Sequence, residues 1–361
     1  MKTYRAALVG CSRMGAFIDN EVVGSLRIIP PYSHAAGYTA CERTDLVACS
    51  DVRPEMMEAV GERYDVPKER HYTDYKELIE KERPDIVSVA TQPEQRAEIV
   101  IHAVENGVKA IYAEKAMAAS LEECDRMVEA VERHGVAFNL GTNRRWNAGY
   151  DTMKGVIDSG ELGDLKSLII YNSATLFNSA SHSFDLILRL NNDVAVSWVQ
   201  AHLPDGDAVL DGDILREDPT AEGIIQFENG VKAYALLSGR GYEIEAICEE
   251  GTITAHNDGL DWRLRRSVSL DPQGRKGTQE DRFPDYEKAS STLRLVEDLV
   301  HALDTGEPTR GGVRVAWTST EMIFAFIESH RRGGARVTLP LQDCRLQLQR
   351  NRQPRQPKFN A

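Results

Sequence analysis

The sequence predicts an α/β protein, with an N-terminal domain built on a doubly wound parallel sheet and a C-terminal α+β domain with an open, mostly antiparallel sheet. The chain has 361 residues, which suits two domains of about 100 to 200 residues each. Short β-rich runs alternate with helical patterns up to residue 140, and longer β-rich runs follow one another after residue 160. We expect domains at 1–142 and 143–345. A basic tail at 346–361 is either a disordered end or an arm onto a neighbouring subunit.

Composition and charge exclude several classes of protein. An apolar share of 42% with 27% charged residues is typical of a globular protein. The net charge of −13 argues against nucleic-acid binding, because phosphate contacts need clustered Lys and Arg. No apolar run approaches the roughly 18 to 20 residues that cross a bilayer, and the N-terminus lacks a signal-peptide core, so we expect a cytoplasmic protein without membrane contact. The six cysteines are scattered and lack metal-ligand spacing, which predicts reduced thiols and no metal site.

The first half contains the repeating pattern of βαβ units. Strands are predicted at 4–10, 45–51, 85–91, 109–114 and 136–140, and helices at 54–64, 73–82, 94–107 and 120–135. The last helix has clear ends, since Ser120 and Glu123 form a capping box and Gly135 fits the glycine that ends a helix. This alternation predicts a parallel sheet covered by helices.

The second half has the pattern of an antiparallel sheet. Its β-rich runs occupy 165–177, 195–203, 221–239, 242–256 and 261–270, and turn sequences such as Glu-Asn-Gly and Glu-Glu-Gly interrupt them. Helices are predicted at 182–190, 291–304 and 313–331. An open sheet with one uncovered face usually finds a partner, so we expect a homodimer or homotetramer.

A variant of the dinucleotide fingerprint follows the first strand. Gly10, Ser12 and Gly15 form GxSxxG, in which serine replaces the middle glycine of GxGxxG. Asp51 ends the second strand, where a carboxylate would bind the adenosine ribose hydroxyls and repel a 2′-phosphate. Asp51 could also be a simple strand-end cap, and Arg53 nearby leaves NADP possible. The pattern therefore predicts a Rossmann domain that binds NAD, with NADP as the alternative.

Two further segments end core strands of the predicted parallel sheet. Thr91, Gln92 and Pro93 follow the strand at 85–91 and are expected to lie over the cofactor, unless they form an ordinary turn. Glu114 and Lys115 follow the strand at 109–114. A lysine that leaves a parallel strand at its carboxyl end points into the crevice where ligands of open α/β sheets bind, and its ammonium can hydrogen-bond a substrate oxygen.

The order of these motifs, from GxSxxG through Asp51, Thr-Gln-Pro and Glu-Lys-Ala to GTNRRWNAGY, resembles the Gfo/Idh/MocA family of oxidoreductases. The resemblance runs from residue 5 to about 340. The family's Glu-Lys-Pro motif is matched by Glu114 and Lys115, with Ala116 in place of the proline. The resemblance implies a Rossmann domain, an open sheet that builds a sugar pocket, and hydride transfer between NAD(P) and a secondary hydroxyl or carbonyl carbon of a sugar, polyol or sugar derivative.

The resemblance also implies roles for residues of both halves. Asn143 and Arg144 become candidates for cofactor and substrate contacts, and Tyr242 for a substrate contact. His182 occupies the histidine of a second family motif, and Asn178 stands where that motif has aspartate. The expected catalytic residues are Lys115 and His182. The expected cofactor-binding residues are Gly10, Ser12, Arg13, Met14, Gly15, Asp51, Arg53, Thr91, Pro93, Glu114, Lys115 and Arg144. The expected substrate-binding residues are Lys115, Asn143, Arg144, Asn178, His182 and Tyr242.

Asn178 leaves the net reaction open, because an amide can orient His182 but cannot neutralise it. One alternative is an enzyme that runs mainly as a reductase, and another is a dehydrogenase in which Asp185 compensates. A third is cleavage of a glycoside or elimination of a group through transient oxidation, with no net redox change. A non-catalytic, dinucleotide-binding regulatory protein is a further alternative. His34, in the insert GSLRIIPPYSHAAGY, lines the pocket entrance or caps a loop, and receives no role.

Overall fold

The computed structural model describes residues 2–171, 175–350 and 356–359. The chain forms two compact units, each described here by itself. The first consists of Met1–Trp146, Ala289–Trp317 and Gln347–Ala361, and the second of Asn147–Lys288 and Thr318–Leu346. This division differs from the expected one at 142 and 345, because residues 289–317 return to the first unit instead of staying in the second.

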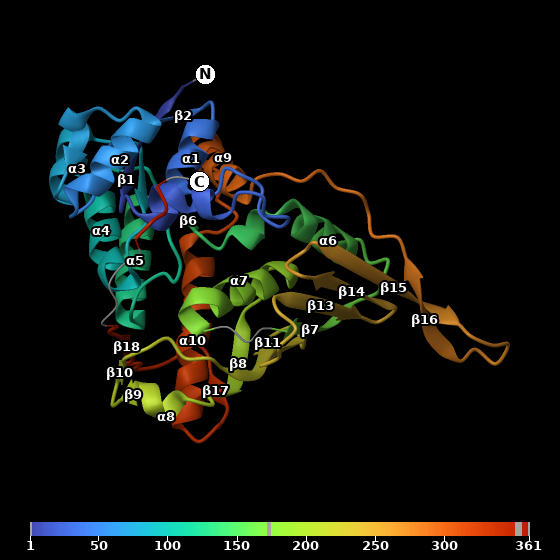
Figure 1. Ribbon diagram of the computed structural model, residues 1–361. Coiled ribbons are helices and arrows are strands. Elements are labelled where there is room, and N and C mark those ends of the chain that lie inside the picture. Colours follow the sequence, from blue (N-terminus) through green and yellow to red (C-terminus); the bar gives the residue numbers. More distant parts are fainter. Residues whose placement is uncertain (1, 172–174, 351–355, 360–361) are drawn as a thin grey trace. The chain divides into compact units, whose positions relative to one another are not determined.

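The first unit is built on a parallel sheet in the order β3-β2-β1-β4-β5-β6 (Figure 1). Its strands are β1 (Tyr4–Val9), β2 (Thr44–Ser50), β3 (His71–Tyr72), β4 (Ile86–Val89), β5 (Ala110–Ala113) and β6 (Ala137–Leu140). The order reverses between β1 and β4, which creates the crevice at the carboxyl ends of these strands where ligands of such sheets bind. The predicted doubly wound sheet is confirmed.

Helices cover both faces of this sheet. On β1, Ala7 and Val9 pack into one apolar cluster with α3, α4 and α5, whereas Ala6 and Leu8 pack into another with α1, α2 and α9. The helices are α1 (His34–Ala40), α2 (Pro54–Tyr64), α3 (Tyr75–Glu82), α4 (Pro93–Glu105), α5 (Leu121–His134) and α9 (Ser291–Thr305), with the short turns η3 (Lys68–Arg70) and η4 (Asn143–Trp146). Burial of Leu295, Val296 and Leu299 explains why α9 belongs to the first unit.

The connection between β1 and β2 is interrupted by an insert. The helical turns η1 (Arg13–Phe17) and η2 (Ile18–Glu21) follow β1, and α1 begins only at His34. The Asp19 carboxylate accepts hydrogen bonds from the backbone N–H groups of Tyr32 and Ser33, at 2.7 and 3.0 Å, and so closes the base of the insert. Ser33 then caps α1 by accepting from the Ala36 N–H at 3.2 Å. The insert therefore delivers His34 to the start of a helix.

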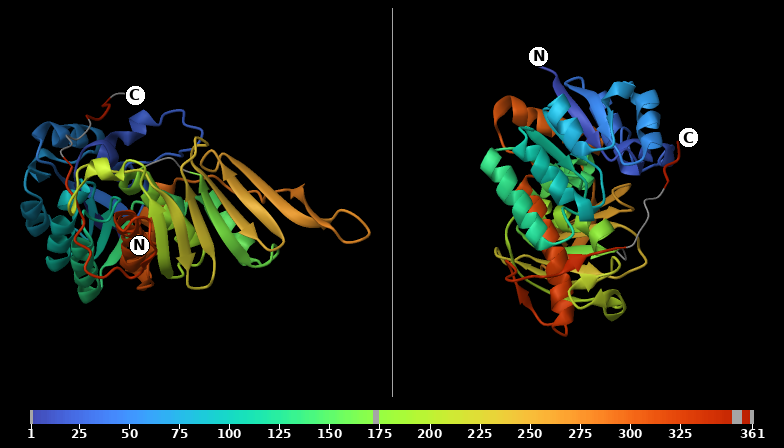
Figure 2. Two further views of the ribbon diagram at one scale, coloured as in Figure 1. Left: turned by 90° about the horizontal axis from the view of Figure 1, so that it is seen from below. Right: turned by 90° about the vertical axis from the view of Figure 1, so that its left-hand side faces the viewer.

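The second unit is built on a mostly antiparallel sheet in the order β16-β15-β14-β13-β7-β12-β11-β8-β17, whose yellow to orange strands lie in a row in the left view of Figure 2. The β7 and β12 strands pair in parallel, and the other neighbouring strands of this sheet pair antiparallel. The strands are β7 (Leu165–Tyr171), β8 (Val196–His202), β11 (Glu222–Phe227), β12 (Lys232–Leu236), β13 (Glu243–Cys248), β14 (Gly251–His256), β15 (Asp261–Ser269), β16 (Lys276–Asp281) and β17 (Val337–Thr338), and β9 (Leu210–Asp211) pairs antiparallel with β10 (Ile214–Leu215). The α+β prediction is confirmed.

Helices pack in the second unit through aromatic contacts. The ring centroids of Phe184 and Phe326 lie 4.9 Å apart, and those of Phe177 and Phe324 lie 5.4 Å apart. These contacts join α7 (Ser181–Leu190) and η5 (Leu176–Ala180) to α10 (Val313–Arg331); the unit also contains α6 (Ala148–Asp158) and α8 (Gly206–Val209). The helices predicted at 182–190 and 313–331 therefore match α7 and α10.

The described part of the tail contacts the first unit of its own chain. The Arg350 guanidinium pairs with the Glu94 carboxylate at 3.0 Å, two residues after β18 (Gln347–Leu348). Near the end, the Phe359 ring packs edge-on against Phe17, with centroids 5.1 Å apart, and Asn20 donates to two tail carbonyls. In its described residues the tail therefore lies against its own unit. Within the described ranges, no helix has the length and apolar character needed to span a bilayer.

Candidate functional site

The turn after β1 is tightly packed at its two fingerprint glycines. Gly10 has φ +95°, and a Cβ there would lie 2.9 Å from the Ala90 carbonyl carbon. A Cβ on Gly15 would lie 1.9 Å from the Gly10 carbonyl oxygen. Only glycine fits at both positions, so the backbone of the turn stays open to an approaching ligand, as a pyrophosphate requires. Ser12 precedes η1, its carbonyl accepts from the Ala16 N–H at 2.9 Å, and its side chain caps nothing in the chain.

The residues after Ser12, and Asp51 at the end of β2, differ in their hydrogen bonds and burial. Arg13 donates to the Glu21 carboxylate at 2.8 Å and is partly exposed, and Met14 is half-buried. Asp51 is 9% exposed and accepts from the Cys11 backbone N–H at 2.9 Å through one oxygen. Its other oxygen accepts from the Arg53 backbone and guanidinium at 3.0 and 3.2 Å. Asp51 therefore ties the turn to the end of β2, with Arg53 beside it.

The loop after β4 carries an unsatisfied polar atom. The Thr91 hydroxyl oxygen is buried and has no hydrogen-bond partner among the described residues, and Pro93 is buried at the first turn of α4. The Arg96 side chain, 1% exposed, donates to the Thr91 and Ala116 carbonyls. Burial lowers the pKa of Arg96 to about 10, against the opposing influence of Glu114 and nearby Glu94. Arg96 therefore joins the loop after β4 to the Lys115 segment, a role that the sequence analysis missed.

Glu114 and Lys115 follow β5 at the same edge of the sheet. The Glu114 carboxylate is buried, accepts from the Lys115 backbone N–H at 3.2 Å, and lies 3.1 Å from the His34 imidazole Nε2. Burial alone would raise the pKa of Glu114, but the hydrogen bond from His34 and the charges of His34, Lys115 and Arg96 hold that pKa below its usual value. Lys115 is half-buried, and the Lys115–Ala116 peptide is cis. Glu114 is therefore a carboxylate directly beside the candidate catalytic lysine.

The segment after β6 supplies another polar atom. Asn143 is 6% exposed, and its amide nitrogen donates to the Thr292 hydroxyl at 3.0 Å. The Asn143 side-chain oxygen is buried and has no partner within the described ranges, so it can accept a hydrogen bond from a ligand. Arg144 is half-buried in η4. The carboxyl ends of β1, β2, β4, β5 and β6 thus bring together every candidate that the sequence places in the first unit.

The remaining candidates lie in the second unit. Asn178 is exposed in η5, and the Asp218 carboxylate accepts from the backbone N–H groups of Phe177 and Asn178 at 2.8 and 2.9 Å. His182 is half-buried in the first turn of α7, and Asp185 is buried one turn later, 1% exposed. The Tyr242 carbonyl accepts from the Asp258 N–H at 2.7 Å. The Asp218 carboxylate therefore lies beside Asn178. No local sequence signal indicates this contact, because the two residues are 40 positions apart.

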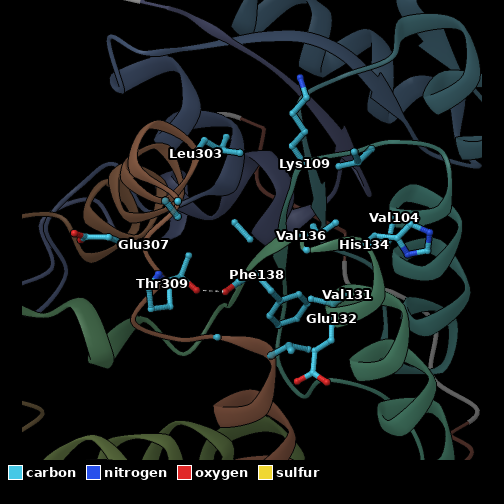
Figure 3. Close-up of a pocket in the computed structure, with 18 of the residues that line it drawn as sticks. Val104, Lys109, Val131, Glu132, His134, Val136, Phe138, Leu303, Glu307 and Thr309 are labelled. Atoms are coloured by element: carbon cyan, nitrogen blue, oxygen red, sulfur yellow. Dashed lines mark hydrogen bonds between the residues drawn. The ribbon is translucent and has the colours of Figure 1, made fainter.

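A pocket of about 550 Å³ in the first unit contains none of the candidates (Figure 3). Its apolar lining includes Val104, Val131, Val136, Phe138 and Leu303, with Lys109, Glu132 and Glu307 around it. These residues come from the amino ends of β5 and β6 and from the ends of α4, α5 and α9, at the sheet edge opposite the dinucleotide turn. The candidate site is therefore distinct from this pocket.

Residues 19–142 match the model of a family described as an oxidoreductase family with an NAD-binding Rossmann fold, Gfo/Idh/MocA. This match assigns residues 19–142, in the first unit, to the Gfo/Idh/MocA oxidoreductase family. The expectation of an NAD(P)-dependent oxidoreductase is thereby confirmed at the level of this family. The family match covers the strands whose carboxyl ends carry Asp51, Thr91, Glu114 and Lys115, and it ends just before Asn143.

Named relatives extend the similarity beyond the first domain. Myo-inositol 2-dehydrogenase of Thermotoga maritima is 26% identical over 296 residues, which cover 76% of this chain and 85% of that enzyme. D-apiose dehydrogenase of Paraburkholderia graminis is 28% identical over 325 residues, or 88% of this chain and 76% of that enzyme. The chain spans about half the length of inositol 2-dehydrogenase of Salmonella typhimurium, at 27% identity over 163 residues, which cover 41% of this chain and 47% of that enzyme.

Solved structures of the family share the fold. An inositol dehydrogenase homologue from Azotobacter vinelandii, crystallised with NADH and myo-inositol, has a TM-score of 0.72 at 16% identity and covers 93% of this chain and 98% of its own. The aldose-aldose oxidoreductase of Caulobacter crescentus, complexed with glycerol, has a TM-score of 0.73 at 16% identity, covering 94% and 100%. Such identities establish the fold alone.

Proposed function

We propose that this member of the Gfo/Idh/MocA family transfers a hydride between NAD(P) and a secondary hydroxyl or carbonyl carbon of a sugar or polyol, in the cytoplasm. The observation that carries the proposal is the position of Lys115: it follows β5 at the sheet edge where the GxSxxG turn, Asp51 and Thr91 also lie. Relatives named as inositol and apiose dehydrogenases support a polyol or sugar substrate.

The residues at this edge fit a dinucleotide. The turn at Gly10 and Gly15 leaves no room for side chains, the Asp51 carboxylate lies at the end of β2, and the Thr91 hydroxyl and Asn143 carbonyl are buried without partners. The turn would hold the pyrophosphate, Asp51 the adenosine ribose, and the loop at Thr91 and Pro93 the rest of the molecule. The bound nicotinamide supplies a hydride acceptor or donor.

The chain's own residues would handle the proton and the oxygen. His182 takes the proton of the substrate hydroxyl, or returns it in the reverse direction, which contributes about 10² to 10⁴-fold to the rate. Lys115 donates a hydrogen bond to the same oxygen as it becomes a carbonyl. Asn143, Arg144, Asn178 and Tyr242 are proposed to orient the substrate.

A panel of polyols and aldoses, with myo-inositol first, tests this proposal. Purified protein is mixed with NAD or NADP and each candidate, and the absorbance of reduced nicotinamide is followed in both directions. Turnover of at least one member is expected, and it should be abolished in Lys115→Ala and in His182→Ala. Tight NAD binding without turnover of any member would favour a regulatory protein. Product formation without net change in cofactor would favour cleavage through transient oxidation.

A further inference from the structure

We propose that His34 is a positioning residue that orients Glu114 and thereby fixes the backbone of Lys115 for catalysis. The inference rests on the proposed function, because it assigns a task at the site of Lys115. It concerns a histidine that the insert between β1 and α1 delivers, and that no motif of the chain marks.

Both ring nitrogens of His34 make polar contacts, and one face of the ring stacks on an aromatic side chain. Its side chain is 0% exposed; Nδ1 lies 2.5 Å from the Ser88 hydroxyl on β4, and Nε2 lies 3.1 Å from the Glu114 carboxylate after β5. The ring stacks on Tyr112 of β5, with centroids 3.7 Å apart and planes 9° apart. A carboxylate only accepts hydrogen bonds, so Nε2 carries the hydrogen that points to Glu114. The ring therefore joins the carboxyl ends of two neighbouring strands.

Glu114 passes this constraint to Lys115. One carboxylate oxygen faces His34, and the other accepts from the Lys115 backbone N–H at 3.2 Å. The carboxylate also fills space that Gly141 leaves open, because a Cβ on Gly141 would lie 2.8 Å from the oxygen that faces His34. Without His34, the carboxylate is free to rotate and to release the Lys115 amide. The Lys115 amide nitrogen is bonded to the Cα that carries the lysine side chain. A shift of this amide would therefore move the base of that side chain.

The charges around Glu114 reinforce the same arrangement. The charged groups that act on its carboxylate are His34, Lys115 and Arg96, and the neighbouring Tyr112 phenol has a pKa raised by burial and by Glu114 itself. Burial would raise the pKa of Glu114, and the hydrogen bond from His34 is the first of the effects that oppose it. Loss of that bond favours the protonated carboxyl, which no longer attracts the Lys115 ammonium.

Two substitutions that differ by one methylene separate positioning from packing. In His34→Gln the side-chain amide reaches the place of Nε2 and still donates to Glu114. In His34→Asn it reaches only the place of Nδ1, so the contact with Ser88 survives and the one with Glu114 is lost. Both remove the aromatic ring that stacks on Tyr112. His71 is the matched control: it lies on β3 and its Nε2 is bonded to the Val66 carbonyl at 3.0 Å.

We expect His34→Asn to lower kcat about 10- to 100-fold, as loss of an orienting partner does, with the KM for NAD within about twofold. His34→Gln should stay within about threefold of the native kcat, because it keeps the bond to Glu114. A second readout needs no turnover. The protein is labelled with trace acetic anhydride over a series of pH values, and peptide mass spectrometry gives the pH at which the Lys115 amine becomes reactive. That pH should fall in His34→Asn and stay near native in His34→Gln.

Equal losses of kcat in the two variants would overturn the proposal, since a ring that only fills space is missed equally in both. A labelling profile of Lys115 that is unchanged in His34→Asn would also overturn it. His71→Gln and His71→Asn should leave kcat and the Lys115 profile native.

If the native protein turns over no substrate, the proposed function fails and the labelling alone decides the role of His34. If His34→Asn does not fold, His34→Leu replaces it. Its apolar side chain fills the space without a donor, so kcat should fall relative to His34→Gln at unchanged KM, and a kcat equal to that of His34→Gln would contradict the proposal.

Discussion

Gly15→Ala tests the packing of the dinucleotide turn most sharply. The added Cβ would lie 1.9 Å from the Gly10 carbonyl oxygen, roughly 1.5 Å short of ordinary contact, which begins at 3.4 Å. The peptide that carries this carbonyl cannot easily yield, because its Cys11 N–H donates to the Asp51 carboxylate at 2.9 Å and the Cβ position of Gly10 faces the Ala90 backbone. We expect the free energy of unfolding to fall by about 1–3 kcal/mol, which is the usual cost of overpacking. The pyrophosphate is expected to approach this backbone, so NAD affinity should fall about tenfold, which is equivalent to about 1.4 kcal/mol.

Gly155→Ala is the matched control for this substitution. Gly155 lies in α6, and nothing lies within 4 Å of the Cβ position. It should gain roughly 0.5–1 kcal/mol of stability from helix propensity and leave NAD binding native. Urea denaturation and calorimetric titration with NAD measure both quantities. The reasoning is refuted if Gly15→Ala matches Gly155→Ala in stability, or binds NAD as the native protein does.

Three other predictions concern candidate site residues. Asp51→Asn should weaken NAD about tenfold, since a charged hydrogen-bond acceptor is lost, and should improve NADP binding beside Arg53; unchanged preference in a titration with both cofactors would contradict this. Lys115→Ala and His182→Ala should each abolish turnover with the Kd for NAD nearly native, and full activity in either would remove that residue from catalysis. The folded-state pKa of Glu114 lies below its ordinary 4.5, so its carboxylate stabilises the protein above that pH and the contribution disappears as the pH falls through the lower value. Glu114→Gln should therefore be less stable than the native protein at pH 7, and a denaturation series should show the difference shrinking below pH 4.5.

The local patterns of the sequence predict much of the fold. Strong periodicity and clear caps locate helices such as α5, where Ser120 accepts from the Glu123 N–H and Gly135 adopts φ +64°. Parallel strands place their carboxyl ends at one edge, so residues that follow them, such as Asp51 and Lys115, are predictable as neighbours in space. Residues 289–317 were assigned to the wrong unit, because the apolar face of α9 does not reveal which sheet covers it.

The supporting residues of the site were not predictable in this way. His34 contacts Glu114, which lies 80 residues further along the chain. Arg96 contacts Ala116 across 20 residues, and Asp218 contacts Asn178 across 40 residues. A lone histidine in an insert, or an arginine in a helix, carries no signal in its own segment. For His34 and Arg96 the signal is their burial, which exists only once the chain is folded, because such polar side chains are rarely fully buried without a partner.

Transfer of deuterium tests the central claim most directly. The protein is incubated with NAD and with polyols or sugars, myo-inositol among them, that carry deuterium on their carbinol carbons, and the nicotinamide is analysed by mass spectrometry. The account predicts reduced nicotinamide with one deuterium, in equal amount to the ketone formed, and none with Lys115→Ala. Native binding of NAD with no deuterium in the cofactor or in any altered product would contradict it.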